Sequence, residues 1–429
     1  MVGHVFLVIA GIGWFFTLLL LLQSWESLRF ARSRCQAIVP EVNPWNKVGL
    51  LVPCKGHDLK LRENLRALFV QDHPNYELCF IIEDVRDPAA EVIRGLQREF
   101  SKVPSQLLVS GRASHTGQKI HNLLAGIDVF DSVQILAFVD SDAEPNPNWL
   151  RGLVHRIELG DCAVTGYRWL VPEKNSLANW LLYSVNSAAA TLYGPGLHHL
   201  LWGGSWAIRR TEFENVGIAQ AWENTLSDDL VASRAIHFAK LGVAFEPRCV
   251  TVSPIDATLG QAAEFLSRQL VVGRRYSPKQ WWLSFVGLIS TQAALWGGLA
   301  KSIGGLIVGD FSSAALWMAG TSVFWGLMVL RSYWRQQLAI VYVPKYERRL
   351  NAARNFDVWG SALVGAFLLF GFVSSWFTHQ IVWRGNGYDI ATSGRVQLIG
   401  RQSVSGQTSS VAIQLSFEPV IELEQRRAT

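Results

Sequence analysis

Four stretches of this chain are long and apolar enough to cross a lipid bilayer as helices, a crossing that takes about 20 mostly apolar residues. They cover approximately residues 5–22, 283–308, 312–330 and 358–377. Residues 23–282 have the composition of a soluble protein and are numerous enough for one domain with its own core. The pattern predicts a globular domain anchored in a membrane. It excludes a freely soluble enzyme, a pore built only of helices and a fibrous protein.

Basic residues are distributed unevenly around the first apolar stretch: none precedes it, whereas Arg29, Arg32, Arg34 and Lys47 follow it closely. Because positive residues tend to stay on the cytoplasmic side of a membrane helix, we expect the large domain in the cytoplasm. A cleaved signal peptide is the alternative, but the stretch lacks a basic n-region and its apolar run is long. We therefore expect an integral protein of a bacterial inner membrane or its equivalent. The net charge of +5 gives no reason to expect a nucleic acid partner.

Composition divides the chain into four expected segments. They are an N-terminal transmembrane anchor (1–24), a cytoplasmic α/β domain (45–280), C-terminal transmembrane helices with a basic loop (281–380), and a tail (381–429) that is disordered from about residue 391. The disorder is expected because the last part of the chain is polar and rich in Ser, Gln and Thr.

Within the large domain, short apolar runs alternate with helical patterns. Strands are expected over 48–52, 76–82, 106–109 and 134–139, and helices over 61–70, 91–100 and 119–128. Such alternation indicates βαβ units and a mainly parallel, Rossmann-like sheet. Ligands of such sheets bind at the carboxyl ends of the strands, so the polar residues that follow each strand are candidates for function.

Asp140 and Asp142 directly follow the strand expected over 134–139. Two carboxylates at this spacing can point the same way and hold a hard divalent ion, which would neutralise charge on a departing diphosphate. A solvated turn is the alternative for any Asp-x-Asp pair. Asp84 follows the strand over 76–82, where its carboxylate could bind a nucleobase or ribose or simply form a turn or helix cap.

Asp228 and Asp229 are adjacent acids at an expected helix start. Helix capping accounts for one of them. The second suggests a general base, which must come within hydrogen-bond reach of the hydroxyl that it deprotonates.

Several short motifs occur along the chain in a characteristic order. They are Val52-Pro53-Cys54-Lys55-Gly56, Glu83-Asp84 with Asp87-Pro88-Ala89, Lys119 with Asn122-Leu123, Asp140-Ser141-Asp142, Gly203-Gly204-Ser205 with Ile208-Arg209-Arg210, Asp228-Asp229, and Trp383-Arg384-Gly385 with Tyr388. In order and spacing they resemble the motifs of ceramide glucosyltransferases. Those enzymes and their bacterial lipid-glycosylating relatives are grouped with the family 2-type inverting glycosyltransferases of GT-A fold. The resemblance spans nearly the whole chain up to about residue 390.

The resemblance implies a GT-A-like domain that binds a UDP-sugar and inverts the anomeric configuration by in-line displacement. Asp229 would be the catalytic base, with Asp228 as its neighbour. Asp140 and Asp142 would hold the diphosphate of the donor through Mg²⁺ or Mn²⁺. The implied donor-binding residues are Lys55, Glu83, Asp84, Lys119 and Asp140, with Asp84 at the uridine end.

One segment departs from the pattern of this family, which places Gln or Arg, two residues, and then Arg-Trp near the membrane. Arg268 can fill the first position, but Val271 and Val272 stand where Arg and Trp are expected. The expected acceptor or leaving-group region is Arg268, with Arg274, Arg275 and Tyr276 in a shifted register. A second difficulty concerns Trp383, which four full membrane spans would place on the far side from the active site. Either one stretch is not a full span, or this motif serves assembly.

The leading hypothesis is a membrane-bound inverting glycosyltransferase that moves a glucose-like hexose from a UDP-sugar to a lipid hydroxyl at the cytoplasmic face. The expected acceptor is of the ceramide or glycolipid type. A processive polysaccharide synthase is the nearest alternative, but it needs a pore of several helices and normally an intact Gln-x-x-Arg-Trp segment. A non-catalytic membrane protein that binds sugar nucleotides is the other alternative, and the Val271-Val272 departure favours it.

Overall fold

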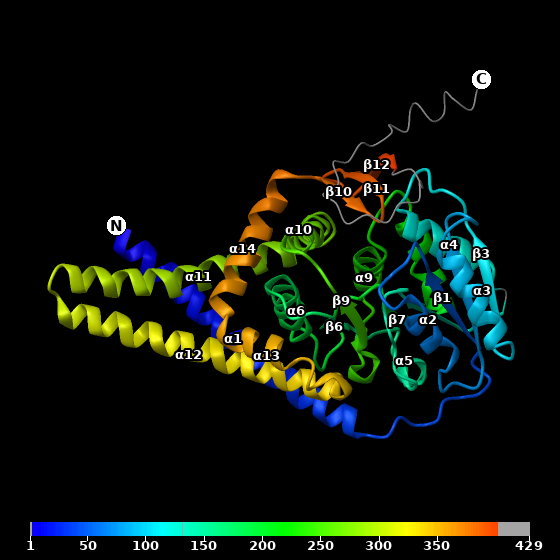
Figure 1. The fold of residues 1–429 in the computed structure, drawn as a ribbon, viewed down its shortest axis with the longest axis horizontal. Coiled ribbons are helices and arrows are strands. Elements are labelled where there is room, and N and C mark those ends of the chain that lie inside the picture. The colour runs from blue at the N-terminus through cyan, green and yellow to red at the C-terminus, as the bar shows by residue number, and fades with distance from the viewer. Residues whose placement is uncertain (1, 131, 402–429) are drawn as a thin grey trace.

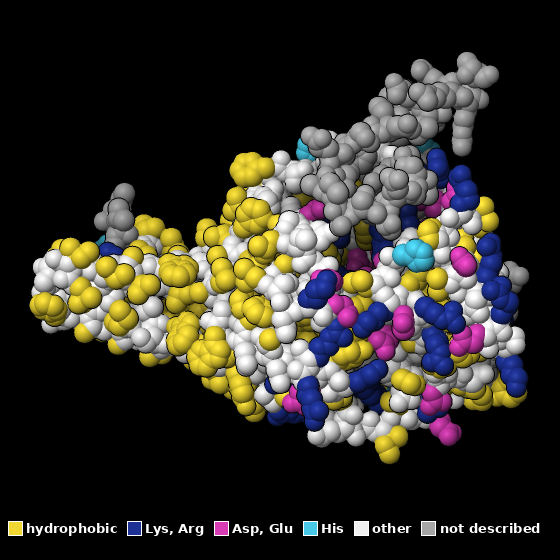
Figure 2. Space-filling model, in the orientation of Figure 1, with side chains coloured by type: hydrophobic (Ala, Val, Ile, Leu, Met, Phe, Trp, Pro, Cys, Tyr) yellow, Lys and Arg dark blue, Asp and Glu magenta, His cyan; other side chains and the backbone are white. Residues whose placement is uncertain are grey.

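Three long apolar helices project from an α/β body (Figure 1) in the computed structural model, which describes residues 2–130 and 132–401. These helices are α1 (Val2–Gln36), α11 (Pro278–Ile307) and α12 (Phe311–Tyr342), and each packs against the other two. Within the described ranges, these three are long and apolar enough to span a bilayer. Figure 2 shows hydrophobic side chains covering the projecting helices, whereas Lys and Arg side chains gather on the body. Apolar surface of this extent is typical of helices that face lipid.

The fourth apolar stretch is a bent pair of helices. The shorter helix α13 (Asn351–Trp359) and α14 (Ser361–Phe377) meet at an angle of 83°, so the pair is either a broken span or a re-entrant segment. The break lies at Gly360, where a Cβ atom would come within 2.7 Å of the Phe356 carbonyl oxygen. Beyond the bend, α14 crosses α10 (Leu259–Tyr276) and leads the chain back to the body (Figure 1). The C-terminal strands therefore lie on the same part of the molecule as the main sheet.

The body is built on a sheet with strand order β3-β2-β1-β4-β7-β5-β8. Its strands are β1 (Val48–Pro53), β2 (Tyr76–Ile82), β3 (Ser105–Val109), β4 (Ile135–Val139), β5 (Ala163–Thr165), β7 (Ser205–Arg209) and β8 (Val243–Phe245). Strands β1 to β4 pair in parallel, and β7 runs antiparallel to both of its neighbours, β4 and β5. The predicted α/β class with a mainly parallel sheet is confirmed, and the expected strands match β1 to β4 to within one residue at each end.

Helices cover both faces of this sheet (Figure 1). They are α2 (Leu61–Phe69), α3 (Ala89–Glu99), α4 (Gln118–Asp128), α5 (Trp149–Glu158), α7 (Arg210–Asn215), α8 (Ile218–Ala221) and α9 (Asp228–Phe238), with short 3-10 turns at Pro247–Cys249 and Pro344–Tyr346. Helix α6 (Leu177–Ala190) packs instead against the strand Arg168–Pro172. Side chains of β1 alternate between two cores: Leu50 and Val52 pack with α2, α3 and α5, whereas Leu51 packs with α4 and α9. Each fully buried apolar side chain of this size contributes about 1.5–3 kcal/mol. The sheet is therefore a rigid platform for the residues at its edge.

Two smaller sheets flank the main one. In the first, β6 (Arg168–Pro172) pairs in parallel with β9 (Thr251–Ile255), and in the second, β10 (Gln380–Trp383), β11 (Asn386–Ile390) and β12 (Val396–Arg401) form an antiparallel sheet. Buried Ile381, Tyr388, Ile390 and Val396 place this C-terminal sheet in the same core as α4 and α9. The prediction of disorder from about residue 391 is thus wrong up to residue 401, because these apolar side chains have a core to pack against. The remainder of that tail, 402–429, lies outside the described residues.

Candidate active site

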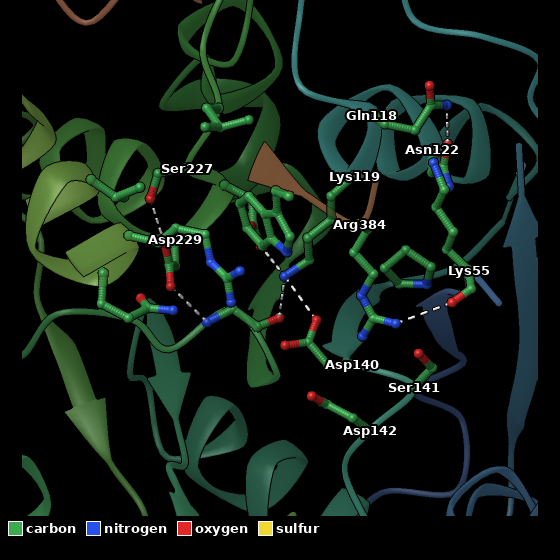
Figure 3. Close-up of a pocket in the computed structure, with 18 of the residues that line it drawn as sticks. Lys55, Gln118, Lys119, Asn122, Asp140, Ser141, Asp142, Ser227, Asp229 and Arg384 are labelled. Atoms are coloured by element: carbon green, nitrogen blue, oxygen red, sulfur yellow. Dashed lines mark hydrogen bonds and ion pairs between the residues drawn. The ribbon is translucent and has the colours of Figure 1, made fainter. Parts of the chain in front are cut away.

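A cavity of about 500 Å³ lies where the carboxyl ends of β1 and β4 meet the start of α9. Its charged lining residues come from separate elements: Lys55 after β1, Lys119 on α4, Asp140 and Asp142 after β4, Arg168 on β6, Asp228 and Asp229 on α9, Arg268 on α10, and Arg384 between β10 and β11. Figure 3 shows the labelled members of this set around a common space. The predicted residues that lie outside the cavity lining, as far as the chain is described, are Glu83, Asp84, Arg274, Arg275 and Tyr276.

The positions of Asp140 and Asp142 follow from β4, whose residues are all buried. The chain turns at Ser141 and Asp142, and Asp140, Ser141 and Asp142 all line the cavity (Figure 3). The Ser141 hydroxyl donates to Asp58 Oδ2 at 2.6 Å. The predicted pair of carboxylates is therefore present at the carboxyl end of a buried strand.

Gly203 and Gly204 allow the chain to pass close to these acids. A Cβ atom on Gly203 would lie 2.6 Å from Asp228 Oδ2 and 2.8 Å from Lys119 Nζ. On Gly204 it would lie 2.3 Å from the Trp202 ring and 2.7 Å from Asp140 Oδ2. Both positions thus require glycine because any side chain would displace a charged group of the cavity.

Lys119 is the cation at the centre of the acidic residues. Its ammonium group lies 2.8 Å from Asp140 Oδ1 and 3.0 Å from Asp228 Oδ2, and it donates to the Gly203 carbonyl at 3.3 Å. Burial disfavours the charged form, but the attraction of Asp140, Asp228 and Asp229 outweighs burial and raises the pKa of Lys119. The lysine therefore stays charged and joins the end of β4 to the start of α9.

The two acids of α9 have different surroundings. Asp228 is buried, and burial, opposed by Lys119 and supported by the charge of Asp229, raises the pKa of Asp228 to about 7. Asp229 is only half-buried, and its carboxylate accepts hydrogen bonds from the Gly203 and Leu230 N–H groups (3.1 and 2.7 Å) and the Ser227 hydroxyl (2.6 Å). Asp229 is thus held in a fixed orientation at the cavity (Figure 3).

The acids after β4 fit a hard divalent cation. Oδ1 of Asp142 is buried and has no hydrogen-bond partner among the described residues. The described ranges hold no group of three or more His, Cys, Asp and Glu side chains that could enclose a metal by themselves. Two carboxylates at the cavity suit an ion such as Mg²⁺ or Mn²⁺ that keeps several coordination positions for phosphate and water.

Charge interactions affect these two acids in opposite directions. Burial favours the neutral form of Asp140, but the neighbouring Lys119 ammonium outweighs it and lowers the pKa of Asp140. Burial raises the pKa of Asp142, and the charge of Asp140 adds to that effect. The Arg168 guanidinium lies 3.7 Å from Asp142 Oδ2, and its positive charge opposes this rise in the pKa of Asp142.

The predicted donor-binding residues near β2 are only partly in the cavity. Lys55 lines it, and its ammonium forms an ion pair of 2.7 Å with Glu83, which follows β2. Arg401 pairs with the same Glu83 carboxylate at 2.5 Å. Asp84 instead accepts hydrogen bonds from the exposed Arg86 side chain (2.7 and 3.0 Å), which lowers the pKa of Asp84. A role for Asp84 at the uridine end therefore stays a prediction.

The residues predicted on helix α10 lie only partly at the cavity. Arg268 and Val272 line the cavity, but Val271 is fully buried in the core with α9. Arg274 donates to the Trp376 and Thr378 carbonyls (3.1 and 2.9 Å), and Tyr276 donates to the Gly394 carbonyl (2.7 Å). The last turn of α10 thus holds α14 and the C-terminal sheet in place through these hydrogen bonds.

Several cavity residues were not predicted as site residues, among them Arg168, Trp202, Trp383 and Arg384. The Arg168 Cζ atom lies 5.6 Å from the centre of the Trp202 ring, which indicates a cation–π contact. Trp383 and Arg384 belong to a motif noted in the sequence, but their position was ambiguous while the last apolar stretch was treated as a full span. The bend at Gly360 brings them back to the cavity.

Residues 5–396 match the family model of glycosyl transferase family 21. A segment of 116 residues, 27% of this chain, is 29% identical to ceramide glucosyltransferase 3 of Caenorhabditis elegans and covers 25% of its length. A segment of 102 residues, 23% of this chain, is 29% identical to ceramide glucosyltransferase of Komagataella phaffii (strain GS115 / ATCC 20864) and covers 19% of its length. The matched segments thus span a quarter or less of these curated relatives.

Two solved structures illustrate the likeness in three dimensions. The mannosyltransferase PcManGT from Pyrobaculum calidifontis, in complex with GDP-Man and Mn²⁺, is 15% identical, with a TM-score of 0.48 over 82% of this chain and 99% of that chain. GalNAc-T7 with UDP, GalNAc and Mn²⁺ is 12% identical, with a TM-score of 0.38 over 55% of this chain and 50% of that chain.

Proposed function

The chain belongs to glycosyl transferase family 21, and from this premise we propose that it transfers a hexose from a UDP-sugar to the hydroxyl group of a lipid, with inversion, at the cytoplasmic face of a membrane. One observation carries the proposal: acids from β4 and α9 share a cavity with Lys119, on a body that bears long apolar helices. The curated relatives are ceramide glucosyltransferases, so we expect an acceptor of the ceramide or glycolipid type.

The donor is proposed to bind with its diphosphate at the end of β4. Asp140 and Asp142 would hold Mg²⁺ or Mn²⁺, and when bound the ion would neutralise charge on the departing diphosphate. Lys119 lies beside Asp140 and would lend a second positive charge at the same place. Lys55 lines the cavity beyond the end of β1 and would contact the nucleotide part of the donor.

Asp229 is the proposed general base. Its orientation is fixed by three hydrogen bonds, and it faces the cavity at the start of α9. It would remove the proton of the acceptor hydroxyl while that oxygen forms a bond to the anomeric carbon. At the same time the bond from the anomeric carbon to the diphosphate oxygen breaks, and UDP leaves. Asp228, buried against Lys119, would keep that lysine in place.

The membrane side of the cavity supports a lipid acceptor. Trp281 and Trp282 at the start of α11 contact Trp376 near the end of α14, with ring centres 5.6 and 5.2 Å apart. Aromatic clusters of this kind are typical of the level where a membrane meets water. Arg268 lines the main cavity and also a smaller one of about 270 Å³ between α10 and the C-terminal sheet. A lipid headgroup that reaches α10 from the bilayer would thus be next to the cavity.

Release of UDP tests this function. Full-length protein in lipid nanodiscs, supplied with Mn²⁺, UDP-glucose and mixed lipids, should release UDP and form a glycolipid that mass spectrometry detects. Asp229→Asn should lower the rate about 10²- to 10⁴-fold, the usual contribution of a general base. The matched control is Asp72→Asn, because Asp72 pairs with Arg151 outside the cavity lining. Unchanged turnover in Asp229→Asn would remove the base assignment, and nucleotide binding without turnover would indicate a non-catalytic protein.

A further inference from the structure

The turn that joins β10 to β11 has an unusual backbone for its sequence. Trp383 pairs with Asn386, so the turn consists of Arg384 and Gly385, and both have positive φ values of 50° and 77°. Two-residue turns of this kind favour Asn-Gly or Gly-Gly, since other L-residues are disfavoured at positive φ. An arginine held in such a conformation indicates that its side chain is needed where the turn places it.

The Arg384 side chain reaches the cavity from the side opposite α9. Its Nη1 atom donates to the Lys55 carbonyl at 3.0 Å and to Asp58 Oδ1 at 2.6 Å. The other oxygen of Asp58 accepts the hydroxyl of Ser141, which stands between the two proposed metal ligands. Figure 3 shows the guanidinium group close to this part of the cavity. Arg384 is thereby tied to the ends of both β1 and β4.

The charges around the end of β4 are arranged on two sides. Lys119 from α4 contacts Asp140 on one side, and Arg384 lies on the other. Both contacts of Arg384 use Nη1, and within the described residues Nε and Nη2 make no hydrogen bond. The planar guanidinium fork therefore keeps donors for a ligand with several oxygens, and such a fork matches phosphate geometry.

The C-terminal sheet holds this arginine rigidly. Tyr388 of β11 accepts a hydrogen bond from the first backbone N–H of α4, on Gln118, at 3.1 Å. The N–H of Val396 donates to the Asn224 carbonyl at 2.8 Å, and the Val396 side chain is part of the core shared with α4 and α9. A cation that is already in position needs no rearrangement as charge develops on a leaving group.

We propose that Arg384 binds the diphosphate of the sugar-nucleotide donor, opposite Lys119, and stabilises it as it leaves. The inference deepens the proposed function and rests on it. In the reaction the bond between the anomeric carbon and the diphosphate oxygen breaks, and its electron pair stays on that oxygen. Arg384 donates hydrogen bonds to phosphate oxygens and transfers no proton. The C-terminal sheet thereby becomes part of the donor site.

Calorimetric titration of the full chain in nanodiscs with Mn²⁺ tests the assignment, with UDP and uridine as probes. The ratio of the dissociation constant of UDP to that of uridine isolates the contribution of the diphosphate to binding. Arg384→Gln should weaken UDP binding about 10- to 100-fold, the range for a hydrogen bond to a charged group, and leave uridine binding unchanged. Arg384→Lys keeps the charge without the fork and should give a smaller loss.

Two controls separate binding from support of the fold. Val396→Ala loosens the packing of the C-terminal sheet outside the cavity, so it should lower the melting temperature and leave the ratio unchanged. Arg395→Gln removes an exposed positive charge from the turn before β12 and should change neither quantity. If Arg384→Gln does not fold, Arg384→Lys tests the same point, since it keeps the positive charge and should still weaken UDP binding selectively.

An unchanged ratio in Arg384→Gln would overturn the assignment, as would an equal change of the ratio in Val396→Ala. Unchanged UDP binding in Arg384→Lys, where Arg384→Gln does not fold, would also overturn it. Failure of the proposed function has a different signature: the wild-type protein would bind UDP no better than uridine. If the wild-type protein instead binds GDP better than guanosine, the proposed UDP-sugar donor is wrong. The ratio of the dissociation constants of GDP and guanosine then tests Arg384 in the same way.

Discussion

Lys119 on α4 and Asp140 after β4 form an ion pair of 2.8 Å inside the cavity. The same ammonium group contacts Asp228 on α9 at 3.0 Å, so one lysine balances acids from two elements that are far apart in the sequence. Removal of one partner from a buried pair leaves the other charge without compensation. The lysine should therefore matter to the folded state as well as to the proposed binding of a donor.

Lys119→Met should destabilise the protein by about 3–5 kcal/mol, the range for breaking a buried charge pair. The comparison is Lys174→Met, because Lys174 pairs with Asp256 at the surface and its side chain is 74% exposed. Thermal unfolding followed by intrinsic fluorescence measures both variants. Equal melting temperatures for the two variants would show that the folded state does not need Lys119 to compensate the charges of Asp140 and Asp228.

The stability of the protein should depend on pH through Asp228. Because burial raises the pKa of Asp228 to about 7, the folded state binds more protons than the unfolded state between roughly pH 4 and 7. The free energy of unfolding contributed by this group therefore falls as pH rises through that window and is constant above it. Asp228→Asn cannot titrate and should lack this part of the slope.

This pH effect is measured as the difference in stability between wild type and Asp228→Asn, because the contributions of the other carboxylates to the pH dependence then cancel. Melting temperatures from pH 4 to 8, without metal or nucleotide, provide the data. Wild type should lose stability relative to the variant as pH rises. A constant difference across the window would contradict the elevated pKa.

Gly204→Ala should disturb the cavity more than its size suggests. The added Cβ would come within 2.3 Å of the Trp202 ring and 2.7 Å of Asp140 Oδ2, so one of them must move. We expect UDP binding in the presence of Mn²⁺ to weaken about 10-fold or more, by analogy with other displaced active-site groups. Gly260→Ala on α10 is the control, since no heavy atom lies within 4 Å of its Cβ, and it should bind UDP normally.

Asp142→Asn should reduce the affinity for the divalent ion. An amide has one oxygen and no charge, so it is a poorer ligand for Mg²⁺ or Mn²⁺ than a carboxylate. Electron paramagnetic resonance of Mn²⁺ in the presence of UDP measures the bound fraction directly, and Asp72→Asn is again the matched control. Wild-type binding in Asp142→Asn would assign the ion to other ligands.

Much of the fold could be predicted from the sequence because its signals are local. The four expected strands are short apolar runs bounded by polar residues, and β1 to β4 occupy them. The convergence of Asp140 with Lys119 could also be expected, since parallel strands deliver their following residues to one edge of a sheet. These contacts depend on topology, and alternation of strands and helices already implies the topology.

The site residues that the sequence did not predict depend on how helices are oriented in the fold, and composition does not determine that orientation. Hydropathy finds the last apolar stretch but not the 83° bend at Gly360, and only the bend returns Arg384 to the cavity. Similarly, the rotation of α10 turns Tyr276 towards the Gly394 carbonyl, away from the site predicted for it. Packing between distant segments decides both outcomes.

The bend also has a consequence for how the protein sits in its membrane. If the bent pair is a re-entrant segment, single crossings by α1, α11 and α12 amount to an odd number of passages in the described chain, whereas a broken span would make the number even. With an odd number, residues near the start of α1 and residues near Arg401 would face opposite compartments. A thiol-reactive dye that cannot permeate the bilayer would label single cysteines introduced at these two places from different sides.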